Sequence, residues 1–373
     1  MKVVIAIDSF KGSMTSMEAG NAAKKGILAA KPDAEVWLSP LADGGEGTVD
    51  ALIEGLGAKK IPVTVTGPLG EKVSCYYGFL EETKSAVMEM ASAAGITLVT
   101  KKDPLRASTY GVGEMIADAL KRGCKNFMIG IGGSATNDGG IGMLKALGFE
   151  FFDEDGNDVG EGAAALAKIE VIRTENKNPL LSGAKFQIAC DVKNPLCGKQ
   201  GATYIFGSQK GVTEEQKDQI DEAMRHYADV TKESLDCDFA DCEGAGAAGG
   251  LGYAFLSYLA GELIPGVELI LQATGLEEKM KNADVVVTGE GRLDAQTVMG
   301  KAPAGVAALA KKYNAKVIAF AGSVASEAKV CNRAGIDAFF PIVRGVTTLE
   351  EAMKKENAME NIAATAEQVF RLL

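Results

Sequence analysis

Residues 126–144 read NFMIGIGGSATNDGGIGML, and this stretch decides the fold. The apolar run 127–131 predicts a short buried strand, residues 132–140 predict a loop of glycine and small polar residues, and residues 142–147 predict the start of a helix. A strand that ends in a glycine loop and opens a helix presents backbone N–H groups at a helix N-terminus. That arrangement binds anions, above all phosphate. The stretch therefore indicates small-molecule phosphate chemistry.

Both ends of the chain alternate short apolar strands with amphipathic helices. This alternation predicts a doubly wound α/β fold with a parallel sheet. The N-terminal part alone has too few strands for a sheet of ordinary width, so we expect residues 1–62 and 284–373 to form one discontinuous domain. The expected strands are 3–7, 35–38, 284–287, 316–320 and 338–343, and the helical patterns include one opened by a Thr15–Glu18 capping box, 49–56, 303–313, 325–334 and 348–371.

The middle of the chain, residues 63–283, has a different pattern of strands and helices from the two ends. This pattern predicts an inserted α/β domain with a mixed sheet. Turn signals at 67–70 and 81–83 separate short strand patterns, which is typical of hairpins. Residues 153–158, DEDGND, predict another tight turn. Helices are expected at 109–122, 141–148, 213–235 and 248–260.

Composition excludes several classes of function. The 373 residues are 47% hydrophobic, enough for two full cores, and the net charge of −11 argues against a nucleic-acid partner. An anionic substrate must then be bound by a local cluster of N–H, Lys and Arg groups. Residues 244–261 carry no charge but include six glycines, which is too little apolar content for a membrane span.

The numbers of cysteines and histidines exclude further kinds of site. Seven cysteines without a CxxC pair indicate reduced thiols, and the chain runs from Met1 directly into a strand pattern, so we expect a cytoplasmic protein without a signal peptide. The single histidine, His226, argues against multi-histidine metal sites and a Ser-His-Asp hydrolase. A general base should therefore be a carboxylate or a lysine.

Five polar, glycine-bearing clusters follow apolar runs. Ligands of open α/β sheets lie outside the carboxyl ends of the strands, so clusters from both domains are expected to converge on one cleft. Each cluster alone is equally typical of turn and helix-cap chemistry, whereas their repetition favours a site. The clusters are 8–13, 43–48, 132–140, 191–198 and 289–301.

Common nucleotide motifs do not explain these clusters. The sequence contains no GxxxxGK[ST] and no HRD or DFG pair. Residues 244–249 match GxGxxG but follow a poor strand pattern at 238–243, so they predict a loop and a closely packed helix rather than a dinucleotide site.

Five segments resemble signatures of the bacterial type I glycerate kinases, in the expected order along nearly the whole chain. The resemblance implies ATP-dependent phosphorylation of D-glycerate, commonly at the 2-hydroxyl. It also implies a flavodoxin-like (Rossmann-like) domain built from both chain ends, with a second domain inserted. The segments are DSFKGS at 8–13, PLADGGEGT at 40–48, GIGGSATNDGGIG at 130–142, ACDVKNPLCG at 189–198 and TGEGRLDAQT at 288–297.

We assign roles to individual residues from the chemistry of phosphoryl transfer. Asp191 is expected to accept the hydroxyl proton, with Asp8 and Asp294 as alternatives. Lys11 and Arg292 are expected to bind the glycerate carboxylate or the γ-phosphate. The ATP phosphates are expected at Gly132, Gly133, Ser134, Asn137, Asp138, Gly139 and Gly140, and Mg²⁺ at Asp43, Glu46 and Glu290.

The sequence is also compatible with two other functions. A nicotinamide-dependent dehydrogenase acting on a small hydroxy acid shares the α/β expectation, but it needs a GxGxxG motif at the first strand. A non-catalytic protein that binds a small anion would not need so many carboxylates. The sequence does not separate 2-phosphoglycerate from 3-phosphoglycerate as the product, and it leaves a homo-oligomer open.

Overall fold

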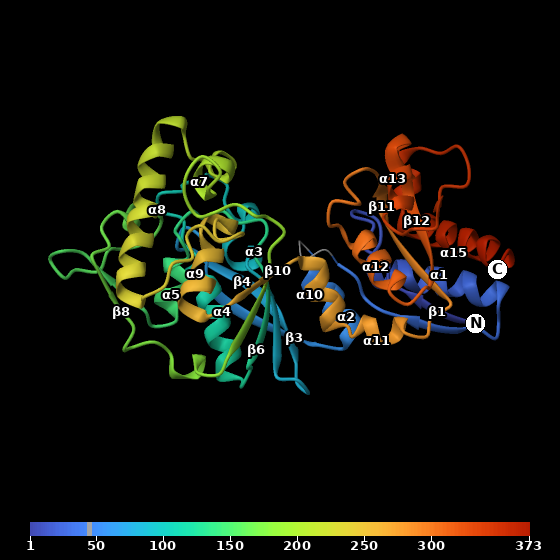
Figure 1. Ribbon diagram of the computed structural model, residues 1–373, viewed down its shortest axis with the longest axis horizontal. Helices are drawn as coiled ribbons and strands as arrows, with labels where there is room; N and C mark the ends of the chain where they lie inside the picture. The colour runs from blue at the N-terminus through green and yellow to red at the C-terminus, as the bar shows by residue number, and fades with distance from the viewer. Residues whose placement is uncertain (43–46) are drawn as a thin grey trace. The chain divides into compact units, whose positions relative to one another are not determined.

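The computed structural model describes residues 1–42 and 47–373 (Figure 1). The chain divides into two compact units. The terminal unit comprises residues 1–42, Asp50–Gly57 and Val267–Leu373, and the inserted unit comprises residues 47–49 and Ala58–Gly266. The sequence-based boundaries differ somewhat, since 62 falls within β3 and 283 follows α11.

The terminal unit contains a five-stranded sheet in which every neighbouring pair is parallel. In chain order its strands are arranged 2-1-3-4-5, which is the flavodoxin-like order. This arrangement confirms the predicted α/β fold class with a doubly wound parallel sheet. The strands are β1 (Lys2–Ile5), β2 (Glu35–Leu38), β11 (Val285–Leu293), β12 (Lys316–Val324) and β13 (Ala338–Pro341).

Helices from both chain ends pack together in this unit. The predicted capping box opens α1 (Ser16–Ala30), because Thr15 Oγ1 accepts from the Glu18 backbone N–H at 3.2 Å and the Glu18 side chain accepts from the Thr15 backbone. Gly26 allows α1 to approach α15 (Lys355–Arg371), since a Cβ there would lie 1.9 Å from the Ala363 carbonyl oxygen. The further helices are α2 (Thr48–Leu56), α10 (Gly266–Ala273), α11 (Leu276–Met280), α12 (Ala302–Lys311), η5 (Ser326–Lys329), α13 (Val330–Arg333) and α14 (Leu349–Met353).

The inserted unit contains the expected mixed sheet, in the order β10-β9-β6-β5-β4-β3. Four strands are parallel, and β4 and β3 extend the sheet antiparallel through the two predicted hairpins. The strands are β3 (Lys59–Thr66), β4 (Lys72–Leu80), β5 (Ser85–Glu89), β6 (Asn126–Gly130), β9 (Lys185–Ala189) and β10 (Glu262–Ile264), and β7 (Glu150–Phe152) pairs separately with β8 (Val171–Arg173).

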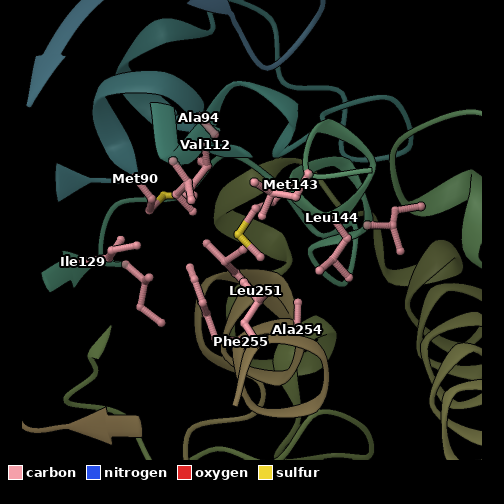
Figure 2. Close-up of a cluster of buried hydrophobic side chains, with 14 of the residues drawn as sticks. Met90, Ala94, Val112, Ile129, Met143, Leu144, Leu251, Ala254 and Phe255 are labelled. Atoms are coloured by element: carbon pink, nitrogen blue, oxygen red, sulfur yellow. The ribbon is translucent and has the colours of Figure 1, made fainter. Parts of the chain in front are cut away.

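A large apolar core holds this unit together, and Ala163, Val212 and Ile220 form a smaller, separate cluster. Figure 2 shows Ile129 of the sheet and Met90, which directly follows β5, in one cluster with Met143, Leu251 and Phe255 from the helices. The helices are α3 (Ala91–Ala94), η1 (Ile96–Leu98), α4 (Tyr110–Lys121), α5 (Ile141–Ala146), α6 (Ala163–Leu166), η2 (Pro179–Leu181), α7 (Ala202–Phe206), η3 (Ser208–Lys210), α8 (Glu214–Leu235), η4 (Ala247–Gly249) and α9 (Leu251–Leu259).

The close packing predicted for residues 244–249 is confirmed. A Cβ at Gly246 would lie 2.2 Å from the Pro195 carbonyl oxygen, and one at Gly249 would lie 2.1 Å from the Thr136 carbonyl oxygen. Gly249 thus lets this segment contact the backbone of the 132–140 loop, and Gly246 lets it contact the backbone at Pro195. None of the helices in the described part of the chain combines the length and apolar character that crossing a membrane requires.

Candidate active site

The topological switch point of the terminal sheet lies between β1 and β11, where ligands of doubly wound folds bind. The chain beyond β1 keeps its parallel register, because the Asp8 N–H donates to the Gly289 carbonyl oxygen at 2.9 Å. The carboxyl ends of the two strands therefore bring Asp8 close to Glu290. The sequence predicted β11 only to residue 287, whereas the glycine-containing segment to Leu293 also pairs with β12.

A pocket of about 670 Å³ opens at this point, and we call it the switch-point pocket. Its volume falls within the range of about 300–1,000 Å³ that is typical of ligand sites. One part of its lining is charged and the other is apolar. The charged residues are Asp8, Lys11, Glu290, Arg292, Asp294 and Lys301, and the apolar residues include Phe10, Ile342, Val343, Leu349 and Met353.

The charged residues of the switch-point pocket are partly paired with one another. Glu290 is buried, and its carboxylate accepts from Thr297 Oγ1 at 2.6 Å and lies 3.8 Å from Lys301 Nζ. Arg292 Nε lies 3.5 Å from Asp294 Oδ2, while the Arg292 side chain is mostly exposed. The pocket thus supplies the local cations that an anionic ligand needs in a protein of net charge −11.

The oxygen donors of the switch-point pocket fit a nucleotide-bound magnesium ion. Mg²⁺ uses one or two carboxylates together with substrate phosphates and water. Asp8 and Glu290 supply two carboxylates there. The other predicted metal ligands, Asp43 and Glu46, lie outside the described residues. Among the residues that are described, no three Asp, Glu, His or Cys side chains form a metal cluster.

A second cavity, of about 220 Å³, lies within the inserted unit, and we call it the loop cavity. It lies beyond the carboxyl ends of the adjacent parallel strands β6 and β9. The loop cavity is lined by Gly132, Gly133, Ser134, Asp191 and Lys210, among others. Two segments that the sequence predicted to act together, the glycine loop and the Asp191 cluster, are therefore brought together.

The first three residues of the glycine loop, 132–134, offer backbone hydrogen-bond donors. Gly132 and Gly133 are exposed. Within the part of the chain that the structure describes, the backbone N–H groups of Gly132, Gly133 and Ser134 donate to no other residue. They are suited to an anionic ligand in the loop cavity.

The rest of the loop is anchored inside the protein. The buried Asp138 carboxylate accepts from the Thr109 N–H and Oγ1, both at 2.8 Å, and from the N–H groups of Gly140 and Gly142 at 3.2 and 3.3 Å. Burial raises the pKa of Asp138, and these hydrogen bonds oppose that rise. The Asn137 amide donates to Thr203 Oγ1 at 3.0 Å.

Gly139 and Gly140 pack equally tightly. Both have positive φ, and a Cβ would lie 2.8 Å from Tyr227 at Gly139 and 2.4 Å from Ala254 at Gly140. The contacts that the structure shows for Asn137, Asp138, Gly139 and Gly140 are therefore internal. Direct contact of these four residues with ATP stays a prediction.

Asp191 and Lys210 are the charged residues that line the loop cavity. Asp191 Oδ1 accepts from the Gly266 N–H at 2.9 Å. Lys210 is 2% exposed, and its Nζ donates to the Thr136 carbonyl oxygen at 2.7 Å. Burial lowers the pKa of Lys210 to about 7, although the Asp138 charge opposes this. The sequence did not predict Lys210, because nothing in the stretch SQKG signals a buried lysine.

Comparisons with known proteins match this chain over nearly its whole length to glycerate kinases. The model of the glycerate kinase family matches residues 3–373. Glycerate kinase of Bacillus subtilis (strain 168) is 45% identical over 371 residues, covering 99% of this chain and 97% of that protein. Glycerate 2-kinase of Escherichia coli (strain K12) is 45% identical over 372 residues, covering 98% of each. A crystal structure of glycerate kinase 2 from Salmonella typhimurium LT2 superposes with a TM-score of 0.91 at 43% identity, covering 99% of this chain and 97% of that one.

Proposed function

Because this chain belongs to the glycerate kinase family, we propose that it transfers the γ-phosphoryl group of ATP to the 2-hydroxyl of D-glycerate. The family is one of phosphotransferases. The relative from Escherichia coli is named glycerate 2-kinase, which supports 2-phosphoglycerate over 3-phosphoglycerate as the product. The comparisons give no support to a nicotinamide-dependent dehydrogenase.

The observation that carries this proposal is the loop cavity. Phosphoryl transfer requires positioned reactants, donors that neutralise phosphate charge and a group that receives the hydroxyl proton. Gly132, Gly133 and Ser134 present unpaired backbone N–H groups there, and Asp191 presents a carboxylate from a separate segment. Donors for phosphate oxygens and a candidate proton acceptor thus line one cavity, which supports the proposal.

Asp191 is the proposed general base. A carboxylate at hydrogen-bond distance from the acceptor hydroxyl orients that hydroxyl and takes its proton as the new P–O bond forms. The loop N–H groups hold the anionic oxygens of the transferred phosphoryl group. The alternative bases, Asp8 and Asp294, line the switch-point pocket instead.

The switch-point pocket is the proposed nucleotide site. Its apolar wall suits a purine, and Lys11 and Arg292 suit phosphates, with the two-pronged Arg292 guanidinium matching planar or tetrahedral oxyanions. Magnesium bound with the nucleotide would supply further charge neutralisation, held by Glu290 with Asp8 and with the proposed ligands Asp43 and Glu46.

Phosphorus NMR of the reaction mixture tests the proposal. D-glycerate, ATP, Mg²⁺ and the full chain should yield ADP and the resonance of 2-phosphoglycerate. Omission of D-glycerate or Mg²⁺ should abolish both. ATP consumption that does not depend on D-glycerate would refute the kinase assignment, and the resonance of 3-phosphoglycerate would refute the 2-hydroxyl as acceptor.

A further inference from the structure

The Lys210 ammonium is an incompletely satisfied buried cation. An ammonium has three N–H donors. One donates to the Thr136 carbonyl oxygen, and within the described chain Lys210 makes no other hydrogen bond and no ion pair. Burial of a cation without a bound counter-ion is costly, so the site favours a ligand that brings negative charge.

The acidic groups near Lys210 do not replace such a ligand. Asp138 interacts with Lys210 electrostatically, but its two oxygens accept from Thr109, Gly140 and Gly142. Asp191 lines the same cavity and accepts from Gly266. Neither residue forms an ion pair with Lys210 in the structure, so an incoming anion can reach the ammonium from the loop cavity.

The size of the loop cavity restricts what that anion can be. Its volume of about 220 Å³ equals that of about seven water molecules. This is below the range of about 300–1,000 Å³ typical of drug-sized ligands. The cavity volume suits a three-carbon acid, whereas a whole nucleotide is larger than the cavity.

We propose that Lys210 binds the carboxylate of D-glycerate in the loop cavity, which places the neighbouring 2-hydroxyl at Asp191. This inference rests on the proposed function and deepens it. One cation and one carboxylate side chain then match the charged group and the reacting hydroxyl of the acid. The loop N–H groups face the oxygens that the phosphoryl group brings.

The charge state of Lys210 gives this inference a distinctive signature. In the free protein the pKa of Lys210 is lowered to about 7 by burial, so the ammonium is lost as the pH rises through 7. A carboxylate such as that of D-glycerate, with a pKa of about 3.5, stays ionised there. Binding therefore requires the protonated lysine and takes up a proton. The affinity should be constant below pH 7 and fall about tenfold per pH unit above it.

Isothermal titration of D-glycerate into the full chain, in two buffers of different ionisation enthalpy, measures this uptake without any variant. Since half of Lys210 is neutral at pH 7, the uptake should approach about 0.5 proton at pH 7 and about 0.9 at pH 8. Glycerol, which lacks the carboxylate, should cause none. Zero uptake with D-glycerate, or uptake only with the nonhydrolysable analogue AMP-PNP, would overturn the assignment.

Variants then attribute the proton to Lys210. Lys210→Met should weaken D-glycerate binding about 100-fold or more, because a buried charge pair is lost. Lys210→Arg should bind D-glycerate without proton uptake, since arginine stays charged. The matched control is Lys199→Met, which removes an exposed lysine of the same unit and should behave as the wild type.

The outcomes separate the two proposals. If the wild type makes phosphoglycerate and Lys210→Met keeps the wild-type affinity for D-glycerate, the role of Lys210 is refuted and the kinase assignment stands. If the wild type makes no phosphoglycerate by phosphorus NMR, the kinase assignment itself fails. Steady-state kinetics give a further criterion, because a lysine that acted only as a general base would lower kcat and leave KM for D-glycerate unchanged.

Discussion

Replacement of Asp138 by Asn tests whether the glycine loop is held from behind by this buried carboxylate. The substitution keeps the size of the side chain and changes its charge and hydrogen-bonding capacity. Asp138 Oδ2 accepts three hydrogen bonds, two from Thr109 and one from Gly142, and Oδ1 accepts one from Gly140. An asparagine can keep the first three only by directing its NH₂ group at the Gly140 N–H.

The expected cost follows from these four bonds. Hydrogen bonds to a charged partner contribute about 1.5–3 kcal/mol and neutral ones about 1 kcal/mol. The stabilising free energy of the three kept bonds therefore falls by about 1 kcal/mol each, and the bond from the Gly140 N–H is lost entirely. Because a neutral asparagine is easier to bury than a carboxylate, part of this loss is offset. We expect a net destabilisation of the loop by about 3 kcal/mol, which corresponds to a factor of about 100 in the local opening equilibrium.

Hydrogen exchange followed by mass spectrometry measures that opening. Peptides that contain the Gly140 and Gly142 amides should exchange about 100-fold faster in Asp138→Asn than in the wild type. The control is Asp229→Asn, which changes an exposed aspartate of α8 and should leave these peptides unchanged. Acceleration below threefold in Asp138→Asn would show that the loop does not depend on this carboxylate.

Three further predictions concern activity and packing. Asp191→Asn should fold normally and lower kcat about 100-fold or more with KM little changed, as expected for a general base, and kcat within a few-fold of the wild type would exclude that role. Arg292→Lys should raise KM for ATP about tenfold and leave KM for D-glycerate unchanged, because the two-pronged contact with phosphate is lost. Steady-state kinetics with each substrate varied measure both constants, and a raised KM for D-glycerate with an unchanged KM for ATP would show that Arg292 binds the acid instead. Gly113→Ala should lower the urea midpoint by an amount equivalent to about 2 kcal/mol, since its Cβ would lie 2.3 Å from the Met143 carbonyl oxygen, and an unchanged midpoint would mean that α4 and α5 shift apart freely.

Much of the fold could be predicted from local patterns. The run of residues 3–7 carries the β-branched and apolar side chains that suit a buried strand, and the buried strand β1 lies there; the pattern at 35–38 forms β2, which is only partly buried. The Thr15–Glu18 capping box was also predicted correctly, because its hydrogen bonds join residues close in sequence.

Features that depend on distant partners could not be predicted in this way. The segment 289–293 has turn composition but forms part of β11, since its backbone pairs with β12. The helical pattern at 348–371 is interrupted at Lys354, whose ψ of 128° is not helical, so α14 and α15 are separate. The local sequence pattern contains no information about which strand will pair with a segment or which packing contacts will end a helix.

In the candidate site, too, local motifs were predicted and features that depend on distant residues were missed. The motifs placed the glycine loop and Asp191 in one site, and they do line one cavity. They did not show that Asp138 anchors the loop through internal hydrogen bonds, because an aspartate beside glycines has the same appearance whichever way it points. Lys210 was missed since burial of a lysine is a property of the folded chain.

The terminal sheet also constrains how the protein is made. On the ribosome β1 and β2 emerge first, yet one neighbour of β1 is β11, which begins at Val285. The inserted unit ends at Gly266, so all of its residues have been synthesised before that strand. The nascent chain therefore carries a folded unit behind a pair of strands with an unfilled edge, the kind of surface that chaperones protect.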